Sequence, residues 1–147
     1  MGRSLCEVYI HFIWTTKNRT PILRDLLEVF VHKKIHAFAK NHKVEVLACN
    51  SAWDHIHVLA KWHSTAAMAD VVREWKSRVS NEWNDPDDDE RGNLKWQSGS
   101  GMFSVSPHEV DRLVNYIANQ KYHHSKKGQA IHRYERGYGS SGNRSAG

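Results

Sequence analysis

The chain is poor in cysteine and in proline, and it has no long uninterrupted hydrophobic run. Its two cysteines, Cys6 and Cys49, form no C-x-x-C pair, so we expect no disulfide framework and a reducing cytoplasm. The N-terminal apolar residues are interleaved with Glu7 and His11, which favours a strand over a signal peptide or a membrane span. With 147 residues the chain can bury a core without such staples, and we expect one cytoplasmic domain with no membrane partner.

Positive charge is what the sequence has in excess. Lys and Arg total 21 against 16 Asp and Glu, which gives a formal net charge of +5. Acidic residues are concentrated in residues 85–89, so the rest of the surface is more basic than this total suggests. A basic surface favours a polyanionic partner, and nucleic acid is the leading class. Charge alone does not separate such a protein from one that is merely soluble.

Hydrophobic periodicity predicts four strands and three helices. The expected strands cover residues 5–15, 43–50, 54–62 and 94–105. The expected helices cover residues 22–41, 65–83 and about 107–124. For the second helix we expect Ser64 or Thr65 as the N-cap and Met68 in the buried stripe.

This element order, β-α-β-β-α-β followed by a helix, predicts an α+β fold of the ferredoxin-like type. Such a fold has a four-stranded antiparallel sheet with two helices on one face. We expect residues 1–124 to form this domain, with a C-terminal helix that carries Tyr116. Residues 125–147 form a basic tail rich in Gly and Ser, which we expect to be flexible or to order on a partner.

The most distinctive local motif is His55-Ile56-His57 in the third predicted strand. Side chains alternate along a strand, so both imidazoles lie on one face and can chelate one divalent ion. Asp54 adjoins them and could orient a ligand. His11, on the first strand, either packs or approaches this site. Taken alone, the motif also fits two ordinary strand histidines.

Tyr116 and Gln120 are four residues apart and share one face of the last predicted helix. A tyrosine beside an apolar stripe most often serves packing. Together with His55 and His57, however, the side-chain oxygen of Gln120 would complete a metal site with positions open to phosphate oxygens. Tyr116 would then lie beside the bound phosphate, where a nearby cation lowers the pKa of a phenol. Tyr116 is therefore a candidate nucleophile.

In these motifs the sequence resembles the small single-tyrosine HUH transposases of bacterial insertion sequences, the IS200-like family. The matching blocks are residues 14–19, 54–59, 76–78, 96–99, 103–106 and 116–124. The resemblance implies that His55 and His57 are paired metal ligands, that Gln120 is the third ligand and that Tyr116 is the nucleophile.

The resemblance also implies a reaction and its partners. Tyr116 would attack a phosphate of single-stranded DNA with the help of Mg²⁺ or Mn²⁺, leave a 5′-phosphotyrosine and later rejoin the strand. The implied substrates are hairpins at transposon ends, and the implied assembly is a homodimer in which one subunit's tyrosine often serves the other's histidines. Five basic residues are candidate DNA contacts: Lys17, Arg19, Arg73, Lys76 and Arg78.

Other interpretations stay open. A domesticated repeat-associated tyrosine transposase, or an HUH replication initiator or relaxase, would keep the enzyme class and differ in substrate. A non-catalytic ferredoxin-like nucleic-acid-binding protein would stack bases on sheet aromatics, but we find no RNP-type aromatic motif. A zinc hydrolase can also carry H-x-H. The further Asp and His expected just downstream are absent, because residues 58–61 are Val-Leu-Ala-Lys.

Overall fold

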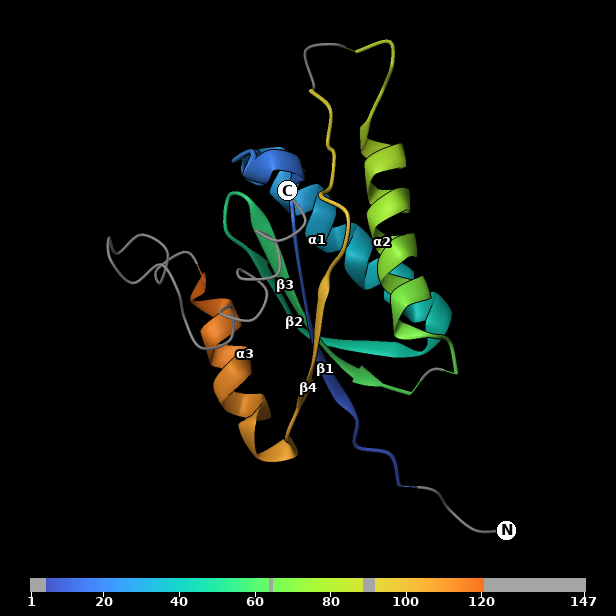
Figure 1. The fold of residues 1–147 in the computed structure, drawn as a ribbon, viewed down its shortest axis with the longest axis vertical. Helices are drawn as coiled ribbons and strands as arrows, with labels where there is room; N and C mark the ends of the chain where they lie inside the picture. Colours follow the sequence, from blue (N-terminus) through green and yellow to red (C-terminus); the bar gives the residue numbers. More distant parts are fainter. Residues whose placement is uncertain (1–4, 64, 89–91, 121–147) are drawn as a thin grey trace.

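A computed structural model of the protein describes residues 5–63, 65–88 and 92–120. The predicted order of elements is confirmed (Figure 1). The helices and strands are β1 (Tyr9–Thr15), α1 (Asp25–Ala39), β2 (Val44–Ser51), β3 (His55–Trp62), α2 (Met68–Trp83), β4 (Gly101–Val105) and α3 (Val110–Ala118).

The four strands form one sheet in the order β2-β3-β1-β4, and every neighbouring pair is antiparallel. This is the predicted ferredoxin-like arrangement. β4 is shorter than the strand predicted for residues 94–105. Before β4 begins, Trp96 forms one isolated antiparallel bridge with Thr16, the residue that follows β1. The interruption includes Gly99, whose φ of 85° is incompatible with extended pairing.

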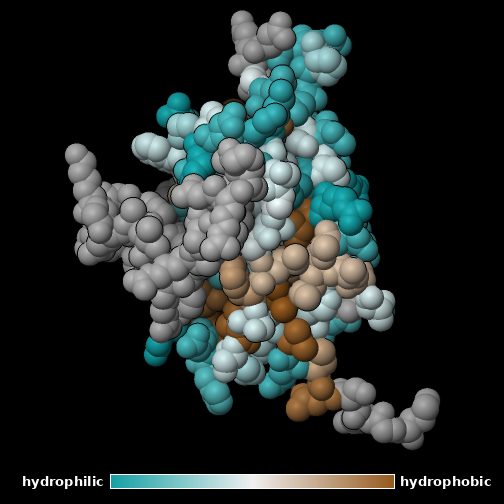
Figure 2. All heavy atoms as spheres, viewed as in Figure 1, coloured by the Kyte–Doolittle hydropathy of each residue, from teal (hydrophilic) through white to brown (hydrophobic). Residues whose placement is uncertain are grey.

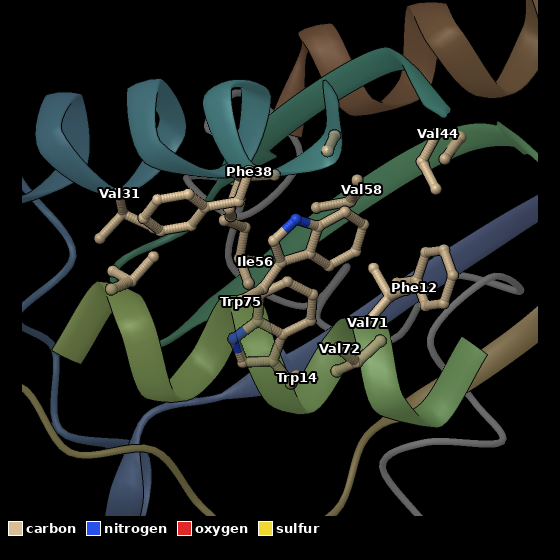
Figure 3. Close-up of a cluster of buried hydrophobic side chains, with 14 of the residues drawn as sticks. Phe12, Trp14, Val31, Phe38, Val44, Ile56, Val58, Val71, Val72 and Trp75 are labelled. Carbon is tan, nitrogen blue, oxygen red and sulfur yellow. The ribbon is translucent and has the colours of Figure 1, made fainter. Parts of the chain in front are cut away.

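The helices α1 and α2 pack on one face of the sheet and form the main core with it. Phe12 and Trp14 are alternate residues of β1 and face these helices. Trp75 of α2 packs against them (Figure 3). The Trp14 and Trp75 rings are stacked with centroids 6.0 Å apart, and Phe12 meets Trp75 edge-on at 5.4 Å. Burying these large rings supplies much of the hydrophobic stabilisation of the domain.

The helix α3 covers the opposite face of the sheet, where it contacts β2 and β3 (Figure 1). Leu113 and Ile117 of α3 are fully buried there against Leu59 of β3. The strongly one-sided pattern of apolar residues in α3 explains this docking. The face of β3 that carries the histidines is therefore covered by the helix that carries Tyr116.

Several predicted boundaries differ from the structure. The N-cap of α2 is Ala67, so Thr65 is not the cap, and Ser64 lies outside the described residues. Met68 is 37% exposed because it is the first residue of α2, one turn before the buried stripe begins at Val71. The helix predicted for residues 107–124 starts with a 3₁₀ turn, Pro107–Glu109, before α3.

Residues 121–124 of that predicted helix, and the predicted tail at 125–147, lie outside the described part of the chain. Within the described part, no helix combines the length and the apolarity that a membrane crossing requires.

Figure 2 shows hydrophobic residues gathered on the visible surface of the molecule, near the end where the N-terminal segment leaves the sheet. Among the described residues, the exposed large hydrophobic side chains include Leu5, Val8, Met102 and Phe103.

Candidate metal and nucleophile site

The two histidines of β3 lie on the same face of the sheet, as the alternation predicted. Ile56 and Val58 point into the main core, whereas His55 and His57 are buried on the α3 side. The centroids of the two imidazole rings are 5.1 Å apart, and the ring planes are inclined by 72°. Two imidazoles in this arrangement can share one ion.

Both imidazoles are held at the same ring atom. Nδ1 of His55 donates a hydrogen bond to Oδ1 of Asp54 over 2.7 Å. Nδ1 of His57 is hydrogen-bonded to Nε2 of His11 over 2.8 Å. Metal-binding histidines are commonly oriented through the nitrogen that does not bind the metal. Nε2 is thus the atom that each ring can offer to an ion.

Asp54 is held in its ionised form. Burial by itself raises the pKa of this carboxyl, but hydrogen bonds and charges from His55 and Arg19 outweigh it and lower the pKa from 3.8 to about 2. Arg19 contributes through Nε, which lies 3.0 Å from Oδ2 of Asp54. A carboxylate can only accept, so the hydrogen on Nδ1 of His55 points to Asp54, and Nε2 is the nitrogen that a neutral His55 ring would offer to an ion.

The third predicted ligand also reaches the site. Nε2 of Gln120 lies 3.2 Å from Nε2 of His55, and the Gln120 side chain is fully buried. Exchanging the two ends of the carboxamide would place its oxygen at this position. Tyr116, one turn earlier, meets His57 edge-on with ring centroids 6.0 Å apart. The four residues predicted to form the site therefore lie together within one chain.

The donors present fit a divalent cation. No group of three or more His, Cys, Asp or Glu side chains suited to a metal occurs in the described ranges. Gln120 is a donor of another residue type, and its side chain lies beside His55. Two imidazole nitrogens and a carboxamide oxygen are all neutral donors, so a bound ion keeps its positive charge for phosphate oxygens.

Asn50 ties α3 to the sheet beside this site, a contact that sequence reasoning missed. Its Nδ2 donates to the carbonyl oxygens of Ile117 and Ala118 at 2.9 and 3.2 Å. These carbonyls belong to the last turn of α3, where side chains commonly satisfy carbonyl groups. Asparagine at the end of a strand is typical of a turn, so the sequence held no separate signal for this contact.

Three of the five predicted DNA contacts line one basic groove of about 640 Å³ beside α2. Lys17, Arg73 and Lys76 line this groove, together with Lys95 and Trp96, which sequence reasoning did not select. Lys76 also has a structural role, because its Nζ donates to the carbonyl oxygens of Gln97 and Gly99. Burial lowers the pKa of Lys76 from its usual 10.5.

The other two predicted DNA contacts are engaged elsewhere. Arg19 is paired with Asp54, as described above. Arg78 is paired with Glu74 at 3.1 Å, and its guanidinium lies 4.0 Å from the centre of the Phe38 ring of α1. The structure therefore does not bring Arg19 or Arg78 into the lining of the groove.

Comparison with known proteins gives a consistent result. The family described as Transposase IS200 like matches residues 4–120. A solved structure of a candidate transposase from Deinococcus radiodurans R1 is 23% identical, covers 82% of this chain and 97% of its own, and has a TM-score of 0.60. A REP-associated tyrosine transposase bound to a REP hairpin is 15% identical, covers 88% of this chain and 73% of its own, and has a TM-score of 0.63. The search of curated proteins found no match.

Proposed function

Because this chain belongs to the IS200-like transposase family, we propose that it cleaves and rejoins single-stranded DNA at insertion-sequence ends through a 5′-phosphotyrosine on Tyr116. One observation carries the proposal. The imidazole pair of β3, the Gln120 amide and the Tyr116 ring meet on one face of the sheet, with His57 and Tyr116 centroids 6.0 Å apart. A protein that only binds nucleic acid has no need of this convergence.

We propose that Nε2 of His55, Nε2 of His57 and the carboxamide oxygen of Gln120 hold Mg²⁺ or Mn²⁺. When bound, the ion supplies Lewis-acid polarisation of the scissile phosphate and offsets charge in the transition state. Asp54 supports this role, because its carboxylate fixes the His55 proton on Nδ1, away from the ligating nitrogen.

The chain's own part in the reaction is nucleophilic. The Tyr116 oxygen attacks phosphorus, the bond from phosphorus to the 3′ oxygen breaks, and the phenol proton is lost. The products are a 5′-phosphotyrosine and a free 3′-OH. Attack by a 3′-OH on the phosphotyrosine reverses the step and rejoins DNA without ATP. The helix α3 supports this chemistry, because it carries the nucleophile one turn from the proposed third ligand.

The test is a denaturation-resistant adduct with hairpin-bearing single-stranded DNA in Mn²⁺ or Mg²⁺. Since the protein stays on the 5′ phosphate, a label at the 3′ end of the DNA should follow the protein, and a 5′ label should be released. Tyr116→Phe should abolish the adduct and retain binding. Tyr9→Phe is the matched control, because Tyr9 packs against the cluster that Tyr116 forms with Leu59, Leu113 and Ile117; it should leave adduct formation intact.

Two outcomes contradict parts of this proposal. Normal cleavage by Tyr116→Phe would exclude Tyr116 as the nucleophile. Cleavage that persists in excess EDTA would remove the metal from the mechanism.

We propose that DNA backbone phosphates bind along the basic groove that contains Lys17, Arg73 and Lys76. Positive charge lining a groove attracts a polyanionic strand, and Trp96 offers an aromatic ring in the same place. The likeness of the fold to a transposase bound to a REP hairpin supports hairpin DNA as the substrate class. Arg19 and Arg78 are left out of this proposed surface because they do not line the groove; Arg73 lines it although it is also paired with Asp70 at 2.6 Å.

We also propose that two copies of the chain form a homodimer. β4 is an edge strand, and it exposes Met102 and Phe103, so it offers unpaired backbone groups beside apolar side chains. Light scattering should give twice the chain's mass. Met102→Lys should return the mass of one chain if this edge is the interface, and an unchanged dimer would place the interface elsewhere.

A repeat-associated tyrosine transposase that processes chromosomal repeats is the second candidate, favoured by the likeness to the REP-hairpin complex. The two functions share the adduct and differ in substrate. Imperfect palindromes in the DNA that flanks the coding sequence identify an insertion-sequence end. Scattered repeat hairpins that are cleaved in place of such ends would instead support the second function.

A further inference from the structure

We propose that His11 of β1 is a positioning residue of the metal site: it accepts the Nδ1 proton of His57 and so keeps Nε2 of His57 available as a ligand. The inference rests on the proposed function and extends it to a residue outside the H-x-H motif. Its role is to fix a tautomer and a ring orientation, without contact with the metal or the DNA.

The antiparallel register places His11 where this contact can form. His57 pairs with Ile13, and His11 pairs with Leu59, so the two histidines are diagonal neighbours on adjacent strands. Their rings are nearly parallel, with an interplanar angle of 17° and centroids 5.1 Å apart. Both side chains are buried, and Phe103 of β4 lies beside His11 with ring centroids 6.3 Å apart. A buried and closely packed pair of rings has little freedom to reorient.

The hydrogen bond between Nε2 of His11 and Nδ1 of His57 is 2.8 Å long, and a neutral imidazole has one donor and one acceptor nitrogen. Two arrangements are therefore possible. If His57 donates from Nδ1, its Nε2 carries a lone pair that can bind an ion. If His11 donates from Nε2, the His57 proton is on Nε2 and blocks that position. Only the first arrangement is compatible with a His57 ligand, and it requires His11 to accept.

The other ligand is arranged in the same way. Nδ1 of His55 is hydrogen-bonded to the Asp54 carboxylate over 2.7 Å. Each proposed ligand thus has its own acceptor at Nδ1, a carboxylate for His55 and an imidazole for His57. Partners of this kind typically change metal affinity by about 10–100-fold when they are removed.

The test compares two replacements of His11 in the full chain without DNA. His11→Phe keeps an aromatic ring and removes the acceptor. His11→Gln keeps an acceptor, since its Oε1 can reach the position of the imidazole Nε2. Binding of Mn²⁺ alone is measured by the EPR signal of the free ion. We expect His11→Phe to weaken binding by about 10–100-fold and His11→Gln to restore it to within about threefold.

A second measurement reads the tautomer directly. Long-range ¹H–¹⁵N NMR spectra of the metal-free protein should show the His57 proton on Nδ1 in the wild type and in His11→Gln. In His11→Phe the proton should be shared between the two nitrogens. If His11→Phe does not fold, the wild-type and His11→Gln spectra still decide the question.

Two results would overturn the inference and leave the proposed function standing. One is a wild-type protein that forms the Tyr116 adduct while its His57 proton is on Nε2. The other is a folded His11→Phe variant that binds Mn²⁺ as tightly as the wild type. A wild-type protein that neither binds Mn²⁺ nor forms the adduct would instead overturn the proposed function, and this inference with it.

Discussion

The two cysteines lie in different surroundings. Cys6 is exposed, whereas Cys49 packs against the main core. Desolvation of the Cys49 thiol, with a smaller contribution from the nearby Glu28, raises its pKa to about 12. The reactive form of a cysteine is the thiolate, so the two thiols should differ sharply in reactivity.

We therefore expect iodoacetamide at pH 8 to alkylate Cys6 rapidly and Cys49 hardly at all. Because the Cys49 pKa is raised, its thiolate fraction stays small until the pH approaches 12. Peptide mass spectrometry after a short reaction measures both sites in one sample. Cys6→Ser should take up almost no label when folded and one equivalent in urea. Rapid labelling of the folded Cys6→Ser variant would contradict the assigned burial of Cys49.

At this scale the sequence predicted, from residue type and spacing, which side chains would gather at the candidate site. His55, His57, Gln120 and Tyr116 were all selected, and the structure brings them together. His11 was left between packing and an approach to the site. His11 and His57 are 46 residues apart in the chain, and their contact depends on the register of β1 and β3. One sequence does not specify that register.

The helix α3 is the element on which the site depends most, because it carries both Tyr116 and the turn that leads to Gln120. Its apolar residues hold it against the sheet, and Asn50 fixes its last turn. Asn50→Ala should therefore loosen the end of the helix without unfolding the domain. Each lost hydrogen bond is worth about 1 kcal/mol, and Asn50→Ala removes two, so local opening should become roughly fivefold faster or more.

Hydrogen exchange of the α3 amides measures this effect. Asn119→Ala is the matched control, because the Nδ2 of Asn119 donates to the Asn115 carbonyl within the same helical segment. We expect faster exchange at residues 113–118 in Asn50→Ala and a smaller change in Asn119→Ala. Equal protection in the wild type and in Asn50→Ala would show that apolar packing alone holds α3.

Prediction at the scale of elements succeeded for their order and failed at their ends. The buried stripes of α1 and α2 and the alternation in β1 and β3 are long enough to identify each element. The ends of α2 and β4 depend on local turns: Ala67 caps α2 without a side-chain hydrogen bond. β4 begins only at Gly101, after Gly99 with its positive φ. Such turns leave weak signals in a single sequence.

The distribution of charge is a property of the whole molecule, and it distinguishes the basic residues from one another. Lys17 and Arg73 come from different parts of the chain and line the same groove, whereas Arg78 lies over Phe38 beside α1. If a DNA strand occupies the groove, Lys17→Ala and Arg73→Ala should each remove about one phosphate contact. The slope of log affinity against log salt should then fall by about 0.7 for each variant.

Fluorescence anisotropy with labelled single-stranded DNA at several salt concentrations measures that slope. Arg78→Ala is the control of the same charge change on the same helix as Arg73, and it should leave the slope unchanged. If the Arg78 variant lowers the slope as much as the Arg73 variant, the strand does not follow the groove. The sequence predicted Lys17, Arg73 and Arg78 alike as DNA contacts. The structure distinguishes them, because Arg78 lies over Phe38 of α1 while Lys17 and Arg73 line the groove.

The proposed ligands and nucleophile are supplied at two distant points of the chain, since Gln120 follows His55 by 65 residues. Translation makes β3 early and α3 late. A nascent polypeptide therefore displays its imidazole pair long before a phenol or a carboxamide can join it. A chain stopped after β4 by a nonsense codon would retain every residue that lines the groove and lack both Tyr116 and Gln120. If the proposed function holds, such a fragment could bind DNA without cutting it.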